Sequence, residues 1–382
     1  MNDWLNRAAA LARRVADAPG VDPQWAEAFA EVPRHVFVPR FHPGPDPSSI
    51  LDASDPGQRE QWLNAVYADE SLVTQYALTP GTTDLWQSTS SSTRPSLMAR
   101  MLTLLDVHDG QRILEVGTGT GYNAALLCRR VGDELVSSVD IDPTLIQAAR
   151  AKLGGFGLHP ALATRDGASG WPEHATYDRI VATCAVPAIP PSWIAQLRPD
   201  GLIVTDVRGE LLSSLLVARA NGDGTVSGRF LAEPGHFMWL RADARNPLRD
   251  GGQMATCIDY DDARSRATPI DPAVLDAPGL RLLIQLTAPG VNQIWTSTRD
   301  GRHLVRVSGR HNSWAELHPA TNTVTQGGPD NLFDHIEHAV ELWDRLGHPA
   351  PGQVGITAGP RGQTIWLDSP ANPVAAAKRV SR

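Results

Sequence analysis

The sequence predicts an α/β protein built on a parallel sheet with helices on both of its faces. Short apolar segments alternate with helical patterns between Pro95 and Asp206, and one such segment ends in a glycine-rich turn that opens a helix. The chain has 382 residues, enough for two or three domains, and an ordinary hydrophobic share of 42%. We therefore expect a soluble globular protein with more than one domain.

The alternating part of the chain supplies the predicted sheet. Helical spacing of apolar residues predicts helices over Ser96–Leu105 and Tyr122–Val131, and a third helix from Pro143, behind the capping residue Asp142, to Leu153. The predicted strands are Arg112–Val116, Leu135–Val139, Ala161–Thr164, Arg179–Thr183 and Leu202–Asp206, with a short helix at Ser192–Leu197 between the last two.

The flanking parts of the chain have a different character. Residues 1–87 are predicted to be mainly helical, with a proline-rich break at 42–47. The turn Asn221-Gly222-Asp223-Gly224 predicts a hairpin between Leu215–Ala218 and Val226–Phe230. We expect an α/β core over 88–245 and a small α+β domain over 246–382. The predicted elements of this domain are strands at Leu282–Leu286, Gln293–Thr298, His303–Val307, Ser313–Leu317 and Thr364–Leu367, a helix at Leu332–Leu346, and a frayed tail after Asp368.

Composition limits the partners and the compartment. The net charge of −8 argues against a broad nucleic-acid-binding face. No apolar run approaches the roughly 20 residues that span a bilayer, so no membrane partner is expected. The three cysteines are widely separated and the twelve histidines show no ligand spacing, so we expect neither a disulfide framework nor a metal. A cytoplasmic protein fits this pattern best.

The glycine-rich turn, Gly117-Thr118-Gly119-Thr120-Gly121, predicts a ligand site. It places backbone N–H groups at a helix N-terminus, where glycine lets a ligand approach the backbone. Asp140 follows Gly121 by nineteen residues, at the end of the next predicted strand, and is positioned to accept hydrogen bonds from both hydroxyls of a ribose. A chance turn would make Asp140 an ordinary capping residue, but the order of strand, turn, helix and acid favours a cofactor site.

The G-x-G-x-G spacing, with Glu115 just before it, resembles motif I of the class I S-adenosylmethionine-dependent methyltransferases rather than a nicotinamide fingerprint. Asp166-Gly167 follows the third strand, where that family contacts the adenine amine. The resemblance implies a Rossmann-like class I methyltransferase fold with N-terminal helices and an extra C-terminal α+β domain. It also implies S-adenosyl-L-methionine as cofactor, S-adenosylhomocysteine as product, and these cofactor-binding residues: Glu115, Gly117, Thr118, Gly119, Gly121, Asp140, Ile141, Asp166 and Gly167.

Segments outside this motif resemble the protein-L-isoaspartate O-methyltransferases. Val32–Pro39 is similar to the VPRxxFVP segment of that family, and Tyr67–Leu72 is similar to its Y-x-D-x-P-L stretch. Tyr177–Ile180, Pro190 and Gln196–Gly201 then follow in the order of the family. The resemblance covers roughly residues 28–240 and implies a carboxyl O-methyltransferase.

The polar run from Ser88 to Pro95 departs from that family. Repair enzymes carry a T-I-S-x-P-like segment here, whereas this chain has Ser88-x-Ser90-x-Ser92-x-x-Pro95. That spacing resembles relatives found beside peptide-maturation genes, including those paired with ATP-grasp ligases or lanthipeptide synthetases. Such relatives methylate an aspartate in a ribosomally made, cyclised peptide, and the ester leads to aspartimide or isoaspartate. The resemblance implies a modified precursor peptide as partner, alongside an ATP-grasp ligase.

The resemblance assigns the hydroxyl run to the substrate. Hydroxyls of Ser90, Ser92 and Thr93, with Ser88, are expected to orient the carboxylate, which is ionised near neutral pH and needs no general base. Three alternatives stay open. The run can be a flexible linker, although it contains no glycine and abuts the core. The protein can be a housekeeping isoaspartate repair enzyme, or a non-catalytic peptide-binding module.

Other residues admit two interpretations each. Arg94 is a cation near the run and can anchor a peptide or lie solvated at the surface. Cys128 is expected in the core, and Cys184 is expected to line the cleft as a small filler. The C-terminal domain can recognise the peptide or cover the hairpin side of the core. Trp295, Trp314 and Trp366 would be contacts in the first case and core residues in the second.

Overall fold

The computed structural model describes residues 3–242, 262–288, 290–299 and 302–377. The chain divides into two compact units. The first contains the residues up to Ala185, Ser192–Thr205 and the segment that begins at Phe237. The second contains Val186–Pro191, Asp206–His236 and the C-terminal part of the chain. This division differs from the three regions expected from the sequence, because the N-terminal helices join the core and the hairpin joins the C-terminal residues.

The N-terminal part of the first unit is mainly helical as far as Val66, as predicted, whereas the end of the region expected to be helical, from Leu72, contains strands instead. Helix α2 begins at Pro23 because Asp22 caps it, accepting a hydrogen bond from the Gln24 amide, and it buries Trp25 and Phe29. The proline-rich break lies between two short strands. The elements are α1 (Asp3–Ala16), α2 (Pro23–Glu31), α3 (Arg34–Phe37), β1 (Arg40–Phe41), β2 (Leu51–Asp52) and α4 (Arg59–Val66).

The polar run forms a strand. Strand β4 (Trp86–Ser92) pairs antiparallel with β3 (Leu72–Leu78), with Leu72 opposite Ser92 and Tyr76 opposite Ser88. Ser90 and Ser92 are buried. The linker interpretation is therefore wrong, because the backbone of this segment is paired and half of its hydroxyls are withdrawn from solvent.

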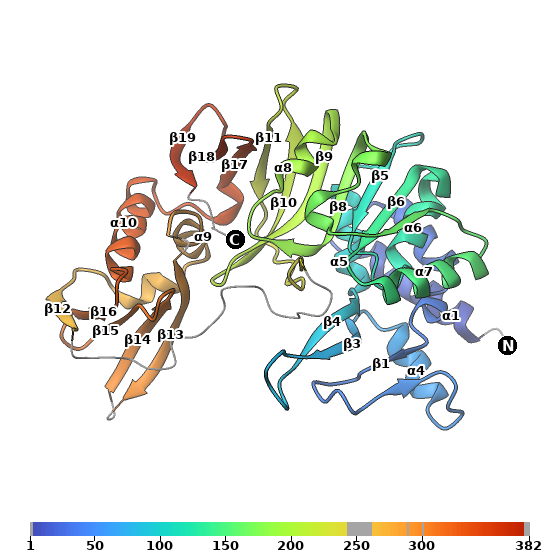
Figure 1. The fold of residues 1–382 in the computed structure, drawn as a ribbon, viewed down its shortest axis with the longest axis horizontal. Coiled ribbons are helices and arrows are strands. Elements are labelled where there is room, and N and C mark those ends of the chain that lie inside the picture. Colours follow the sequence, from blue (N-terminus) through green and yellow to red (C-terminus); the bar gives the residue numbers. More distant parts are fainter. Residues whose placement is uncertain (1–2, 243–261, 289, 300–301, 378–382) are drawn as a thin grey trace. The chain divides into compact units, whose positions relative to one another are not determined.

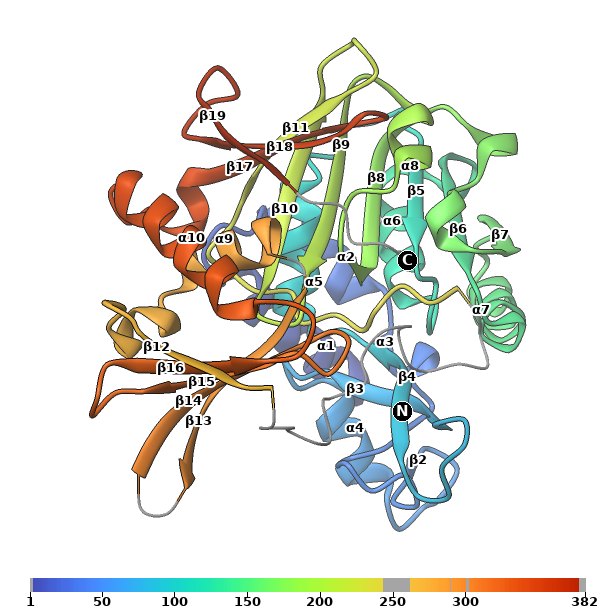
Figure 2. The same cartoon turned by 60° about the vertical axis from the view of Figure 1, so that its left-hand side comes forward.

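The core of the first unit has the predicted alternation of strands and helices. Strands β5, β6, β7 and β8 pair in parallel, in the order β8-β5-β6-β7, and Figure 2 shows them side by side. Strand β9 follows β8 at the other side, and every residue of β5 is buried, including Glu115. The elements are α5 (Pro95–Leu104), β5 (Ile113–Val116), α6 (Tyr122–Val131), β6 (Val136–Asp140), α7 (Pro143–Gly155), β7 (Ala161–Thr164), β8 (Tyr177–Val186), α8 (Pro191–Ala195) and β9 (Leu197–Arg208).

The second unit begins with the predicted hairpin. Strands β10 (Ser213–Ala220) and β11 (Val226–Phe230) pair antiparallel, and β11 also pairs with β17 (Val354–Gly359). Strands β18 (Gly362–Leu367) and β19 (Pro373–Ala377) continue the sheet. The tail predicted to fray after Asp368 is thus ordered as far as Ala377, and residues 378–382 lie outside the described part.

A second, five-stranded sheet lies in the same unit (Figure 1). Its order is β12-β16-β15-β14-β13, so three of its strands confirm the predicted meander. The two helices that accompany it, α9 and α10, share its apolar core. The elements are β12 (Arg264–Ala267), α9 (Pro278–Thr287), β13 (Val291–Arg299), β14 (Arg302–Gly309), β15 (Trp314–His318), β16 (Thr323–Gly327) and α10 (Leu332–Arg345).

The strand predicted at Leu282–Leu286 is wrong, because this segment lies inside helix α9. Pro278 occupies the first turn, and Leu280, Leu283 and Ile284 are fully buried at helical spacing. Leu282 and Leu286 are buried too, so the run is apolar on every side and its period could not distinguish a helix from a strand.

The tryptophans of the second unit divide between core and surface. Trp314 and Trp366 are buried, as expected of core residues. Trp295 is 37% exposed, on β13 at the end of the five-stranded sheet. Within the described ranges, no helix is long and apolar enough to cross a membrane.

Candidate active site

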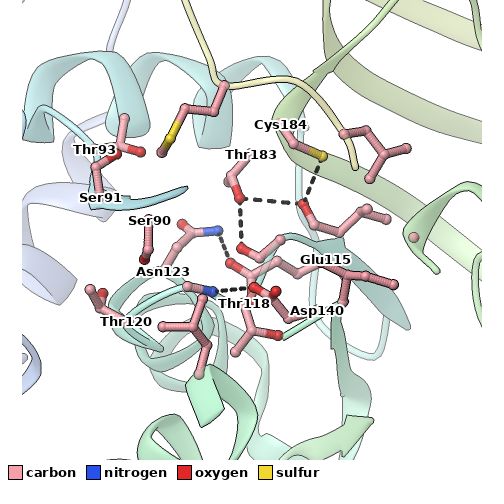
Figure 3. A pocket seen from close by; sticks show the side chains of 18 of the residues that line it. Ser90, Ser91, Thr93, Glu115, Thr118, Thr120, Asn123, Asp140, Thr183 and Cys184 are labelled. Carbon is pink, nitrogen blue, oxygen red and sulfur yellow. Dashed lines mark hydrogen bonds between the residues drawn. The ribbon is translucent and has the colours of Figure 1, made fainter. Parts of the chain in front are cut away.

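A pocket in the first unit collects most of the residues singled out in the sequence (Figure 3). It encloses about 860 Å³ of unfilled space, including its open mouth. The glycine turn and the ends of β6 and β8 form one side, the residues Thr89–Thr93 of β4 and its following turn form another, and Met238–Arg241 close a third. These walls form a concave site that joins the glycine turn to the polar strand.

The glycine turn takes a shape that requires glycine at its first position. Gly117 has φ of 100°, and a Cβ there would lie 2.7 Å from the hydroxyl oxygen of Thr183. The Thr183 hydroxyl instead donates to the carbonyl of Gly117, at 2.7 Å. The turn therefore lies directly against the end of β8, with its backbone open to the pocket.

Asp140 fastens the turn to the end of β6. Its carboxylate accepts a hydrogen bond from the Gly119 amide at 2.9 Å and another from the Asp142 amide at 3.0 Å. Burial raises the pKa of Asp140, while these two amides oppose the rise. Each carboxylate oxygen keeps a further lone pair, so the residue can still accept hydrogen bonds from ribose hydroxyls.

Glu115 lies fully buried beneath the turn. It accepts hydrogen bonds from the Asn123 amide group at 2.7 Å and from the Ser138 hydroxyl at 2.5 Å. The Ser138 hydroxyl also contacts the Thr118 hydroxyl at 2.6 Å. Burial raises the pKa of Glu115 to about 7. Glu115 therefore organises side chains around the turn, which is a structural role in addition to the predicted contact with the cofactor.

The lining fits S-adenosylmethionine. The Oδ1 atom of Asn123 is a buried acceptor without a partner in the described structure, and the pocket holds it near the turn. An ammonium group such as that of the methionine moiety would satisfy this acceptor, and the Asp140 carboxylate suits the ribose. The bare backbone of the glycine turn leaves room for the chain that joins them.

The hydroxyl strand forms the opposite side of the pocket. Ser90 and Ser92 are each 3% exposed and both line it, together with Thr93. The backbone of Ser91 comes close to the turn, because a Cβ on Gly119 would lie 3.7 Å from the Ser91 carbonyl oxygen. The strand and the glycine turn are thus adjacent walls of one site.

Two bridges hold the hydroxyl strand against the cofactor side. Gln75 accepts a hydrogen bond from the Thr89 hydroxyl at 2.8 Å and donates to the Asp142 carboxylate at 3.1 Å. The guanidinium of Arg241 donates to the carbonyl of Thr89 at 3.3 Å. Both bridges link the strand to the loops that surround the glycine turn.

Arg34 supports the hydroxyl strand from behind. It is fully buried, and its guanidinium donates to the Ser92 hydroxyl and to the carbonyls of Ser92 and Thr93. The same group donates to the carbonyls of Val66 and Ala68, each at 3.0 Å. Arg34 stands in the VPRHVFVP segment, and its role could not be read from the sequence because its partners come from two other segments of the chain, 66–70 and 92–93.

Three of the predicted site residues lie outside the lining. Ser88 is on β4, before the lining residues begin. Gly121 instead faces α7, where a Cβ would lie 3.0 Å from the Cβ of Ala149. Asp166 caps a short helical turn by accepting a hydrogen bond from the Ala168 amide, while its neighbour Gly167 does line the pocket. All other predicted cofactor and substrate residues line it.

The alternatives for Arg94 and the cysteines resolve in part. Arg94 is exposed, and its backbone amide donates to the Ser71 hydroxyl. Cys128 is buried in α6. Cys184 is buried and lines the pocket as expected, with its thiol 3.7 Å from the carbonyl of Val116. The described residues hold no group of His, Cys, Asp or Glu side chains placed to bind a metal.

The segment Met238–Arg241 was missed by the sequence analysis. It joins the core through a bridge between Ala185 and Trp239, in which the Ala185 amide donates to the Met238 carbonyl at 2.8 Å. A single bridge has no periodic sequence pattern, so nothing in the chain marked this segment as part of the site.

The fold and the pocket together define a class I S-adenosylmethionine-dependent methyltransferase. A family model described as protein-L-isoaspartate(D-aspartate) O-methyltransferase (PCMT) matches residues 48–234. The chain belongs to this family and is an S-adenosylmethionine-dependent carboxyl O-methyltransferase related to the isoaspartate enzymes.

Individual relatives agree with this assignment. The chain is 31% identical over 226 residues to protein-L-isoaspartate O-methyltransferase 2 of Archaeoglobus fulgidus, which covers 59% of this chain and 88% of the relative. It is 37% identical over 207 residues to protein-L-isoaspartate O-methyltransferase of Anaeromyxobacter dehalogenans, covering 54% of this chain and 78% of the relative.

A solved structure extends the likeness over the C-terminal part. A protein-L-isoaspartate O-methyltransferase matches with a TM-score of 0.55 and 21% identity, covering 94% of this chain and 99% of that one. The match shows a common fold beyond the core.

Proposed function

We propose that this methyltransferase transfers a methyl group to the side-chain carboxylate of an aspartate in a ribosomally synthesised, post-translationally modified macrocyclic peptide. The observation that carries the proposal is the hydroxyl strand, which lines the pocket with Ser90, Ser92 and Thr93 beside the glycine turn. Its Ser-x-Ser-x-Ser pattern is the feature that resembles the peptide-maturation relatives.

The hydroxyl strand suits a carboxylate nucleophile. An aspartate is ionised near neutral pH, so the protein has to position it and partly desolvate it rather than remove a proton. Neutral hydroxyl donors hold the carboxylate without a tight ion pair, which would stabilise the ground state and slow the reaction. The two carboxylates of the lining, Glu115 and Asp140, already accept hydrogen bonds from the fold and face the cofactor side.

The chemistry of the step is simple. S-adenosylmethionine, when bound, supplies an electrophilic methyl group, and its transfer to a carboxylate oxygen breaks the carbon–sulfur bond and leaves S-adenosylhomocysteine. Asp140, Asn123 and the glycine turn would hold the cofactor, while Ser90 and Ser92 would orient the carboxylate. No residue of the protein needs to form a covalent bond.

The methyl ester accounts for the predicted products. The next backbone nitrogen of the peptide attacks the ester carbonyl and expels methanol, giving an aspartimide that persists or hydrolyses to isoaspartate. An enzyme that prepares such an ester would act after cyclisation of the peptide. We therefore propose an ATP-grasp ligase as the enzyme that supplies the substrate.

The second candidate is repair of isoaspartyl residues in damaged proteins. Its support is specific, because the family model and the relatives named above carry the isoaspartate activity in their names. The chemistry at the pocket would be the same, with an isoaspartyl carboxylate in place of the aspartyl one.

One experiment separates the two candidates. The protein is incubated with S-adenosylmethionine and, in parallel, an isoaspartyl test peptide and a cyclised Asp-containing precursor peptide, and mass spectrometry follows methyl ester and aspartimide. We expect turnover of the cyclised peptide. Efficient turnover of the isoaspartyl peptide with none of the cyclised one would reject the tailoring function in favour of repair.

A further inference from the structure

The two buried serines of the hydroxyl strand both accept hydrogen bonds from residues behind the strand. Ser92 Oγ accepts hydrogen bonds from both Nε and Nη2 of Arg34, each at 3.2 Å. Ser90 Oγ accepts a hydrogen bond from the hydroxyl of Thr74 at 3.0 Å. Thr74 stands on β3 and Arg34 on α3, so the two supports come from different elements of the first unit.

This arrangement fixes the direction in which the Ser92 hydroxyl donates and restricts that of Ser90. A hydroxyl has one hydrogen to donate and two lone pairs to accept with, whereas a guanidinium has donors alone. The Ser92 hydrogen must therefore point away from Arg34. In the described part of the chain neither Ser90 nor Ser92 donates its hydrogen to a protein acceptor, and both line the pocket.

Arg34 is held too firmly to adapt to a ligand. Besides Ser92 it donates to the backbone carbonyls of Val66, Ala68, Glu70 and Thr93 at 2.9–3.2 Å. Burial lowers the pKa of Arg34 to about 10, so the group stays charged at neutral pH. A cation fully engaged with carbonyls and one hydroxyl polarises that hydroxyl and strengthens it as a donor.

We propose that Arg34 and Thr74 are positioning residues that orient the Ser92 and Ser90 hydroxyls as donors, and that this pair favours a carboxylate over the isosteric carboxamide. A carboxylate offers one oxygen to each hydroxyl. A carboxamide cannot place its NH2 group against Ser92, whose acceptor positions are filled by Arg34, and against Ser90 it meets the one lone pair that Thr74 leaves open, in place of a donated hydrogen bond. The inference rests on the proposed contact between these serines and the substrate carboxylate.

A double-mutant cycle tests the link between Arg34 and Ser92. Arg34→Lys keeps the charge and loses the planar fork, so we expect kcat/KM for the peptide to fall about tenfold while affinity for S-adenosylmethionine, measured by titration calorimetry, is unchanged. In the Ser92→Ala background the same change should have no further effect, because its target is gone. Additive effects, or a parallel loss of cofactor affinity, would overturn the proposal.

Variants of Thr74 provide a second test of the proposal, which holds even if Arg34→Lys does not fold. Thr74→Val removes the hydroxyl that supports Ser90 with little change of shape, and Thr74→Ser is the matched control that retains it. For each variant, the inhibition constant of an Asn-containing analogue is divided by the KM of its Asp counterpart. We expect Thr74→Val to lower this ratio severalfold and Thr74→Ser to preserve it, and equal ratios would overturn the proposal.

The double-mutant cycle and the Thr74 variants are both assayed with the isoaspartyl peptide and with the cyclised Asp-containing peptide. Turnover of the isoaspartyl peptide alone would reject the tailoring function, while the cycle would still test the serine pair on that peptide. Unchanged ratios on a peptide that is turned over would reject the proposed orientation of the two serines and leave the tailoring function standing.

Discussion

The two sides of the pocket are built in different ways. The cofactor side consists of a glycine turn and one carboxylate, at the ends of neighbouring parallel strands, and it offers backbone amides and Asp140. The side that we propose for the substrate, called here the substrate side, is an antiparallel pair of strands that offers side-chain hydroxyls, supported by Arg34 and Thr74.

This difference has a consequence for function. A backbone turn fixed by Gly117 and Asp140 cannot change its donors by substitution, so it suits a cofactor that is the same for every member of a family. A wall of side chains changes its chemistry with each substitution, so it suits substrates that differ between members. The hydroxyl strand is therefore the place where a repair enzyme and a tailoring enzyme would diverge.

The largest expected effect is on the cofactor side. Asp140→Asn removes a charge. It also places an NH2 group against the backbone amide of Gly119 or Asp142, each of which donates to the carboxylate in the unaltered protein. We predict that affinity for S-adenosylmethionine falls about 100-fold, because two charge-assisted hydrogen bonds to the ribose weaken. Calorimetric titration measures it, and a melting curve checks the fold.

Asp166→Asn serves as the matched control, since Asp166 lies outside the lining and caps a short turn. We expect a smaller loss of affinity in this variant. Equal losses in the two variants would contradict the geometry and restore the direct adenine contact predicted from the sequence.

The second effect is a pH dependence of stability. The pKa of Glu115 is raised from 4.5 to about 7, so the folded state binds more protons than the unfolded state between these values. The contribution of Glu115 to the free energy of unfolding is fully present below pH 4.5. It is lost as pH rises toward 7, by roughly 3 kcal/mol in total.

Glu115→Gln should flatten this slope while retaining one acceptor oxygen for Ser138 or Asn123. Urea unfolding of both proteins at several pH values measures the difference, which isolates Glu115 from other titrating groups. Parallel curves for the two proteins would show that Glu115 does not titrate in this range.

The cofactor side could be predicted from the sequence because its parts are close together along the chain. The turn, the helix α6 and Asp140 fall within about 25 residues, and each element has a local signal: glycines, a capping Asp142, an apolar strand. Parallel strands bring their ends to one edge, so the order of motifs sufficed to place them.

The substrate side could be predicted only in part. The serine pattern was visible, but the strand that carries it has a polar sequence, and its pairing with β3 joins residues that lie 8 to 20 positions apart in the chain. Arg34, Thr74 and Met238–Arg241 reach the site through tertiary contacts, which no local pattern records. Resemblance to a family marked the segment around Arg34 without giving its role.

The third effect tests the substrate side directly. Ser90→Ala should lower kcat/KM for the peptide about tenfold, the value of one hydrogen bond to a charged group, and leave the affinity for S-adenosylmethionine unchanged. Steady-state kinetics with the cyclised peptide measure the first quantity, and titration measures the second.

Ser88→Ala is the matched control, because Ser88 lies on the same strand outside the lining. Its kinetics should match those of the unaltered protein. A loss in Ser88→Ala equal to that in Ser90→Ala would mean that the strand acts as a whole, through its fold, and would remove the distinction between the two sides.

The smallest expected effect concerns whether a residue outside the pocket, Trp295 of the second unit, contributes to peptide binding. Trp295 is exposed on β13, beside a small apolar hollow lined by Ile294 and Leu304, whereas Trp314 is buried. Trp295→Ala should change the free energy of unfolding by less than about 1 kcal/mol, while Trp314→Ala should cost about 3–5 kcal/mol. If the second unit contacts the peptide, Trp295→Ala raises the peptide KM about threefold with kcat unchanged, since an exposed aromatic contributes binding and no chemistry. An unchanged KM would confine recognition to the hydroxyl strand and leave the second unit a structural role.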